Sequence, residues 1–200
     1  MTVIGITGPT GAGKTTVLNV LKELGGCILD ADAVYHELLE SDPTLRSGLE
    51  ERFGPLTRGD GTIDRKKLGA VVFHDPAALD DLNTIAHRRV VLELGSRLWQ
   101  AKQEGIQAAA VDAIALFESG AAELCHVTLA VLAPPEVRVR RIMAREGISE
   151  EYARARVAAQ KPDQWFEERC DHILRNDGGR EDLEARARAL LLSIIPKEEL

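Results

Sequence analysis

One loop near the start of the chain restricts the possible folds more than any other feature. It runs from Gly8 to Thr15, reads G-P-T-G-A-G-K-T, and fits the pattern G-x-x-x-x-G-K-[ST] at every fixed position. The preceding run Val3–Thr7 is rich in β-branched residues, and apolar residues recur with helical spacing between positions 17 and 24. The loop is therefore expected to join a buried strand to the first turn of a helix.

In that context the loop predicts a binding site for the phosphates of a nucleoside triphosphate. Glycines let successive backbone N–H groups converge on phosphate oxygens, and the helix N-terminus adds a partial positive charge. Lys14 would reach the β- and γ-phosphates, and the Thr15 hydroxyl would bind Mg²⁺ directly. The expected phosphate contacts are Gly8, Gly11, Ala12, Gly13, Lys14, Thr15 and Thr16. A glycine-rich turn without a ligand is the simpler alternative, but the complete motif between strand and helix argues against it.

Composition excludes several classes of protein. The 200 residues are 44% hydrophobic, which is enough for a core, and no apolar run approaches the roughly 18 residues of a membrane span. The net charge of -7 argues against a general nucleic-acid or acidic-membrane binder. Three separated cysteines without a CxxC pattern exclude a disulfide scaffold and favour a reducing cytoplasm as the location of the protein.

Short apolar segments alternate with helical patterns, which predicts a parallel sheet covered by helices. The expected strands are Val3–Thr7, Cys27–Asp30, Ala108–Val111, Val127–Leu132 and the weaker Ile173–Leu174. We therefore expect an α/β fold with three layers, α/β/α, around a five-stranded parallel sheet. Two charged, helix-rich stretches interrupt this pattern, and no linker sets them apart. The expected organisation is a single domain, 1–200, with a discontinuous core (about 1–34, 103–135 and 170–200), a helical insertion that binds the second substrate (about 35–102) and a helical lid (about 136–169).

Missing motifs narrow the type of nucleotide-binding protein. A GTPase should carry N-K-x-D and D-x-x-G, and a transporter ATPase should carry an LSGGQ-like signature, but the sequence contains none of these. A small phosphotransferase remains, in which an arginine-bearing lid closes over ATP.

Two carboxylates follow the second expected strand, at the sheet edge where open α/β proteins bind ligands. Alternate residues of a strand share a face, so Asp30 and Asp32 could point the same way. A carboxylate beside the phosphate loop can accept a proton from an attacking hydroxyl or hold Mg²⁺ through water. Alternatively, one of the two caps the next helix, which is predicted over Ala33–Leu39.

The segment Arg138–Arg145 is strongly basic in an otherwise acidic chain. Arg141 and Arg145 are four residues apart and therefore share a helical face. Guanidinium groups bind phosphates bidentately and stack on purine rings, so these two arginines are expected to contact ATP. For most of the arginines between Arg138 and Arg169 we expect a solvated helix with ion pairs to nearby glutamates.

Nearly end to end, the chain resembles the dephospho-coenzyme A kinase family. The motifs that carry the resemblance follow the phosphate loop in this order: D-A-D at Asp30–Asp32, I-D-R at Ile63–Arg65, L-N-x-I-x-H at Leu82–His87, F-E at Phe117–Glu118, the lid residues Arg141 and Arg145, R-x-x-x-Q at Arg156–Gln160, and the pair Asp171 and Asn176. The resemblance implies the P-loop NTPase fold and transfer of the ATP γ-phosphoryl to the ribose 3′-hydroxyl of dephospho-CoA, with ATP as co-substrate and Mg²⁺ as cofactor. It implies Asp32 as catalytic base, with Lys14 and Arg141 also catalytic. The implied acceptor contacts are Asp32, His36, Asp64, Arg65, His87 and Glu118, and Mg²⁺ would meet Thr15 directly and Asp32 through water.

The sequence also departs from the family pattern. The usual Pro-Leu before L-F-E is Ile114-Ala115, the proline after the histidine is Arg88, and an arginine position is occupied by His36. These changes concern the acceptor and leave the ATP side unaltered. The alternatives are a kinase for another small acceptor such as a nucleoside monophosphate, a P-loop prenyltransferase, and a non-catalytic ATP-dependent binding module. A prenyltransferase would need a tRNA-binding surface, which the net charge disfavours, so small molecules are the expected partners, with neither nucleic acid nor a membrane.

Overall fold

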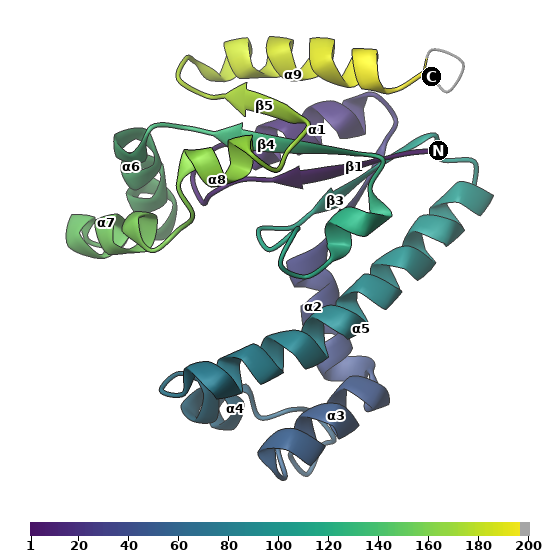
Figure 1. Ribbon diagram of the computed structural model, residues 1–200, viewed down its shortest axis with the longest axis vertical. Helices are drawn as coiled ribbons and strands as arrows, with labels where there is room; N and C mark the ends of the chain where they lie inside the picture. The colour runs from purple at the N-terminus through teal and green to yellow at the C-terminus, as the bar shows by residue number, and fades with distance from the viewer. Residues whose placement is uncertain (197–200) are drawn as a thin grey trace.

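A five-stranded, all-parallel sheet forms the centre of the protein in a computed structural model that describes residues 1–196 (Figure 1). The strands follow the order β2-β3-β1-β4-β5, so that β1 lies in the middle and pairs with β3 and β4. Their bounds are Thr2–Thr7 (β1), Cys27–Asp30 (β2), Ala108–Asp112 (β3), Val127–Leu132 (β4) and His172–Arg175 (β5). The predicted α/β class and the five-stranded parallel sheet are therefore confirmed.

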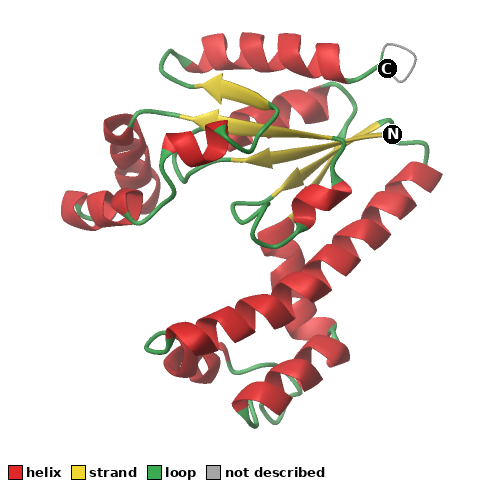
Figure 2. Cartoon of the chain, viewed as in Figure 1, coloured by secondary structure: helices red, strands yellow, loops and turns green. Residues whose placement is uncertain are grey.

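Helices cover both faces of this sheet, and a second group of helices extends below it (Figure 2). Their bounds are Lys14–Glu23 (α1), Ala31–Ser41 (α2), Pro43–Phe53 (α3), Arg65–Val72 (α4), Pro76–Gln103 (α5), Ala121–Leu124 (the short η1), Pro135–Glu146 (α6), Glu150–Ala158 (α7), Asp163–Glu167 (α8) and Arg180–Ile194 (α9). Helices α2–α5 occupy the segment predicted as the insertion, and α6–α8 occupy the segment predicted as the lid. That these groups act as separate functional units stays a prediction.

The alternating direction of strand side chains explains how the layers are packed. In β4, Leu129 and Val131 lie in the core shared with α1 and α9, whereas Ala130 and Leu132 pack with Phe166 of α8 on the other side. All four strand residues are fully buried. A strand that is apolar on both faces is what a central parallel sheet requires, and this explains why an unbroken apolar run marked β4 in the sequence.

Aspartates begin several helices of the lower group. Asp42, Asp64 and Asp75 are the N-caps of α3, α4 and α5, and each carboxylate accepts hydrogen bonds from backbone N–H groups of the first turn. Asp42 is buried and also accepts a 2.7 Å bond from Arg89 Nε, which joins α3 to the long helix α5. Local capping signals therefore define where these helices start and hold them against α5.

The structure corrects the expectation for Asp30 and Asp32. Strand β2 ends at Asp30, and Asp32 already belongs to the first turn of α2, so the two carboxylates do not alternate along one strand. Asp30 is the N-cap, and its Oδ1 accepts hydrogen bonds from the backbone N–H of Asp32 at 2.9 Å and of Ala33 at 3.1 Å. The capping alternative therefore applies to Asp30, and Asp32 is left free for another role.

The expectation for Arg138 is also wrong, since this residue is not on a solvated helix face. Only 3% of Arg138 is exposed, and its guanidinium lies against the phosphate loop rather than in solvent. Ion pairs to glutamates do occur further along, for example between Arg154 of α7 and Glu136 of α6 at 2.7 Å. The lid therefore contains both kinds of arginine.

Candidate active site

The phosphate loop has a backbone path that only glycine can follow at two positions. Gly8 has φ +130°, and a Cβ there would lie 2.2 Å from the carbonyl oxygen of Val131 in the neighbouring strand. Gly13, the residue before α1, has φ +111°. Lys14 Nζ donates a 2.9 Å hydrogen bond to the carbonyl oxygen of Gly8, so the lysine lies across the loop. The loop is therefore already curled in the shape that converging N–H donors require.

Behind the loop, Asn176 links it to the lid. This residue follows β5, is buried, and donates from Nδ2 to the carbonyl oxygen of Ala12 at 2.7 Å. Arg141 of α6 donates to Asn176 Oδ1 and to the carbonyl oxygens of Gly11 and Ala12, each at 3.3 Å. The predicted ATP residue Arg141 therefore lies directly against the phosphate loop.

A cavity of about 350 Å³ opens above the loop. Its lining is strongly cationic and consists of Thr10, Gly11, Gly13, Lys14, Thr15, Asp112, Ile114, Arg141, Arg145 and Arg156. Arg145 and Arg156 both form ion pairs with Glu146, which holds the ends of α6 and α7 together at the rim. The structure therefore brings the predicted residues Lys14, Thr15, Arg141 and Arg145 around one cavity and adds Arg156, which the sequence reasoning gave no role.

Asp112 is the functional candidate that sequence reasoning missed. It is the last residue of β3, lies in register with Asp30 of β2, and lines the cationic cavity. Burial raises the pKa of its carboxyl to about 6; Lys14 opposes this shift, and Asp30 and Asp32 add to it. The available signal was its place at the carboxyl end of a central strand, the criterion that drew attention to Asp32.

Lys14 shows the complementary electrostatic effect. Burial lowers the pKa of its ammonium group, while the charges of Asp112 and then Asp32 raise it. Arg145 and Arg138 lower it further by repulsion. The charge of Lys14 therefore depends on carboxylates that lie beside the phosphate cavity.

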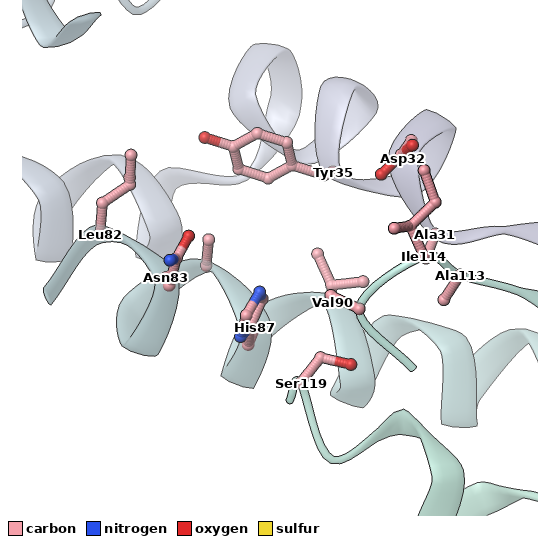
Figure 3. Close-up of a pocket in the computed structure, with 12 residues that line it drawn as sticks. Ala31, Asp32, Tyr35, Leu82, Asn83, His87, Val90, Ala113, Ile114 and Ser119 are labelled. Atoms are coloured by element: carbon pink, nitrogen blue, oxygen red, sulfur yellow. The ribbon is translucent and has the colours of Figure 1, made fainter. Parts of the chain in front are cut away.

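A second cavity, of about 240 Å³, lies between α2, α5 and the loop after β3. Asp32 and Tyr35 of α2 face Asn83 and His87 of α5 across it (Figure 3). The wall is mostly apolar and includes Leu82, Ala86, Val90, Ala113 and Ile114. Because Ile114 also lines the cationic cavity, the two cavities adjoin at this residue. An acceptor bound here would therefore have a carboxylate and a phosphate site at one end.

Comparison with known proteins decides which kinase this arrangement belongs to. A model of the dephospho-CoA kinase family matches residues 2–182. The chain belongs to the dephospho-CoA kinase family. It is 36% identical to the dephospho-CoA kinase of Dehalococcoides mccartyi, with all of this chain and 98% of that protein covered, and 35% identical to that of Corynebacterium diphtheriae, with 95% and 96% covered.

Solved structures agree with this family at the level of the fold. TT1252 from Thermus thermophilus is 35% identical, with a TM-score of 0.74 and 98% of both chains covered. A dephospho-CoA kinase from Campylobacter jejuni has a TM-score of 0.62 at 24% identity, over 96% of this chain and 97% of that one. The protein is thus a P-loop kinase that uses ATP to phosphorylate dephospho-CoA. Between residues 1 and 196 no helix is long and apolar enough to cross a membrane.

The cavity between α2 and α5 continues outward. A wider cavity of about 530 Å³ shares Asn83, His87 and Ser119 with the first and is also lined by Glu118 and Arg88. Burial lowers the pKa of the His87 imidazole, and the Glu118 carboxylate opposes that shift. The predicted acceptor residues Asp32, His87 and Glu118 therefore lie along one continuous cleft.

Three other predicted acceptor residues do not line these cavities. Asp64 is the N-cap of α4. Hydrogen bonds from two backbone N–H groups, and the guanidinium of Arg58, hold the pKa of its carboxyl below the usual value. Arg65 forms a 3.3 Å ion pair with Glu40 at the end of α2. His36 is exposed on α2, with its ring 5.8 Å from that of Tyr35. Acceptor contacts for these residues stay predictions.

Proposed function

We propose that this chain transfers the γ-phosphoryl group of ATP to the ribose 3′-hydroxyl of dephospho-CoA, with Asp32 as the general base. The observation that carries this assignment is the position of Asp32. Its carboxylate lines the acceptor cavity, and its charge also acts on Lys14 in the phosphate cavity. A hydroxyl bound beside Asp32 is therefore next to the place where the γ-phosphate is held.

The reaction requires mainly alignment of the attacking hydroxyl with the γ-phosphate and neutralisation of the phosphate charge. Asp32 accepts the proton of the 3′-hydroxyl as its oxygen attacks the γ-phosphorus, and the bond from that phosphorus to the β,γ-bridging oxygen breaks to release ADP. Lys14 and Arg141 offset the negative charge on the transferred group and on the leaving oxygen. Both cations are held by loop carbonyl oxygens, Lys14 by that of Gly8 and Arg141 by those of Gly11 and Ala12, so they are in position before ATP binds.

The residues around the phosphate cavity are suited to Mg²⁺ bound together with ATP. Magnesium prefers oxygen ligands and usually keeps several waters. The Thr15 hydroxyl is exposed at the first turn of α1 beside the loop, and the carboxylates of Asp32 and Asp112 act on the same Lys14. Thr15 would bind the ion directly and Asp32 would hold one of its waters. When bound, Mg²⁺ would neutralise phosphate charge.

We also assign the protein to the cytoplasm. Cys27, Cys125 and Cys170 are free thiols in the structure, which supports a reducing compartment. Burial raises the pKa of Cys125 to about 12 and that of Cys170 to about 11, so neither carries a reactive thiolate.

An acceptor panel tests the reaction. ADP release is followed with dephospho-CoA, AMP or shikimate, and the product is examined for a ribose 3′-phosphate by phosphorus NMR. We expect turnover of dephospho-CoA alone. Turnover of AMP or shikimate without dephospho-CoA would reassign the acceptor, and ATP binding without transfer to any acceptor would favour an ATP-dependent binding module.

The role of Asp32 is tested with Asp32→Asn. Loss of a general base lowers turnover by about 10²–10⁴-fold, while the dissociation constant for ATP should change little because the phosphate loop is intact. Asp30→Asn makes the same chemical change two residues away, and asparagine is an equally good N-cap. We expect a much smaller effect there. Equal losses in both variants would remove the special role of Asp32.

A further inference from the structure

The lid holds both backbone groups of one phosphate-loop residue, Thr10. The N–H of Thr10 donates to Gln160 Oε1 at 2.9 Å, and its carbonyl oxygen accepts from Arg138 Nε at 3.1 Å. Arg138 also donates to the same Gln160 Oε1 at 2.6 Å, which closes a ring of three hydrogen bonds. A single side-chain oxygen therefore joins the loop to two parts of the lid that are 22 residues apart in sequence.

This contact is tightly enclosed. Arg138 is 3% exposed, and a Cβ on Gly11 would lie 3.0 Å from the carbonyl oxygen of Arg138. The backbone of α6 thus lies directly against the loop. Within the described part of the chain Arg138 has no ion-pair partner within 4.0 Å, so its guanidinium is solvated by hydrogen bonds to the neutral oxygens of Thr10 and Gln160, with the charge of Asp163 acting on it from further away. Removing one of these acceptors would leave a buried cation poorly solvated, which is costly.

The same ring fixes the cations of the phosphate cavity. Arg141 lies three residues after Arg138 on α6, and Arg156 lies on α7, which ends at Ala158, two residues before Gln160. Both line the phosphate cavity. In a helix, a rotation or shift at one residue moves the residues one turn away on the same element. Through its bond to Arg138, Gln160 therefore fixes the turn of α6 that carries Arg141, and the same bond holds the chain just beyond the end of α7, the helix that carries Arg156.

We propose that Gln160 is a positioning residue for ATP, whose amide oxygen sets the conformation of the Thr10 peptide and, through Arg138, the approach of the lid arginines. Gln160 lines neither the phosphate cavity nor the cavity between α2 and α5, although a smaller neighbouring cavity places it near Ile114 and Glu118. Its effect should therefore appear in ATP affinity and in turnover, and not in the Michaelis constant for dephospho-CoA.

The test replaces Gln160 with leucine, asparagine or glutamate. Leucine removes the acceptor oxygen, and asparagine keeps the amide but shortens its reach by one methylene. Because hydrogen bonds to a cation and to a buried N–H are lost together, we expect both variants to weaken ATP binding by about tenfold to a hundredfold and to lower kcat similarly. Gln160→Glu keeps an acceptor oxygen at the same reach and should stay within about threefold of the parent protein.

Three controls make the outcome decisive. ATP affinity is measured by calorimetry without acceptor, so the result for Gln160 holds even if the acceptor were not dephospho-CoA. Gln164→Leu is the matched control, since Gln164 is exposed on α8 and its side chain bonds, among residues 1–196, to Glu168 alone at 2.9 Å. Melting temperatures are recorded for every variant.

Gln160→Leu and Gln160→Asn could lower the melting temperature while ATP affinity and kcat of the folded protein stay unchanged. That result would mean that the ring of hydrogen bonds is purely structural, and it would overturn the proposal. Failure of Gln160→Glu to restore ATP binding would also overturn it. If Gln160→Leu does not fold, Gln160→Asn carries the same comparison, because its polar side chain is retained.

Discussion

Replacing Asp112 with asparagine should make the protein more stable and less active. The Asp112 carboxyl lies at the end of β3 and forms no side-chain hydrogen bond within residues 1–196, and burial raises its pKa from 3.8 to about 6. An acid whose pKa is raised by folding binds more protons in the folded than in the unfolded state between those two values. Stability therefore falls as pH rises from about 4 to about 6, and the cost is fully present above pH 6.

The size of the effect follows from the shift. A change of about two pKa units corresponds to about 3 kcal/mol at pH 7.5. At pH 4.5 the cost is only about 1 kcal/mol, because that pH lies just above the unfolded pKa of 3.8 and most of the pH interval over which the cost accumulates lies above it. Asparagine resembles the protonated carboxyl and removes this cost. For a chain of 200 residues the gain at pH 7.5 corresponds to about 5–10 °C in Tm. Turnover should fall at least about tenfold, because Lys14 loses the carboxylate that most favours its charge.

Urea unfolding of the parent protein and Asp112→Asn at the two pH values measures the difference directly. Asp171→Asn is a control of opposite sign. The Asp171 carboxylate accepts from the hydroxyl of Thr128 at 2.7 Å and its N–H at 2.8 Å, and these bonds lower its pKa. That variant should lose stability at pH 7.5 and lose less as the pH falls. An Asp112→Asn protein that is less stable than the parent at pH 7.5, or equally shifted at both pH values, would refute the reasoning.

Two further substitutions test the phosphate loop and the lid. In Gly13→Ala the new residue would have to adopt φ +111°, and its Cβ would lie 2.4 Å from Asn176 Nδ2. We therefore expect a loss of about 3 kcal/mol or more in the free energy of unfolding, together with weaker ATP binding. The control Gly25→Ala, at φ +85° with open space around the Cβ, should cost only the backbone strain of about 1–2 kcal/mol. Arg141→Lys keeps the charge but cannot bond to Asn176 and two loop carbonyls at once, so kcat should fall about tenfold or more. Arg140→Lys, on the exposed face of the same helix, should leave kcat unchanged. Equal kinetics in the two lysine variants would contradict the assignment of Arg141.

Much of the fold was readable from local sequence, because the central strands are apolar on both faces. The expected Val127–Leu132 is the observed β4, whereas the edge strand β5 extends one residue beyond the expected Ile173–Leu174 at each end. The start of α2 was placed two residues too late. Asp30 and Asp32 are both good N-cap residues, so sequence alone could not decide which of them capped the helix.

The functional site, like the fold, was predicted where its residues are close together in sequence and missed where they are far apart. The phosphate loop is a continuous motif and was identified completely. Arg138 was misassigned because its partner Thr10 is 128 residues away, and helical spacing does not show which arginine meets the loop. The contacts of Asn176 with Ala12 span 164 residues and were equally hidden. Only tertiary structure distinguishes these cases.

The missing proline of the family motif illustrates why a local departure need not disturb the site. Proline would stiffen the backbone where Ile114 stands. Here β1 holds that segment instead, since the N–H of Ala113 donates to the carbonyl oxygen of Ile6 at 3.2 Å and the Thr7 hydroxyl donates to that of Ile114 at 3.2 Å. The backbone is thus fixed beside the phosphate loop, and the substitution changes only the side chain that separates the two cavities. Because Ile114 lines both cavities, a difference from other family members should appear at their junction, where the acceptor meets the phosphate site.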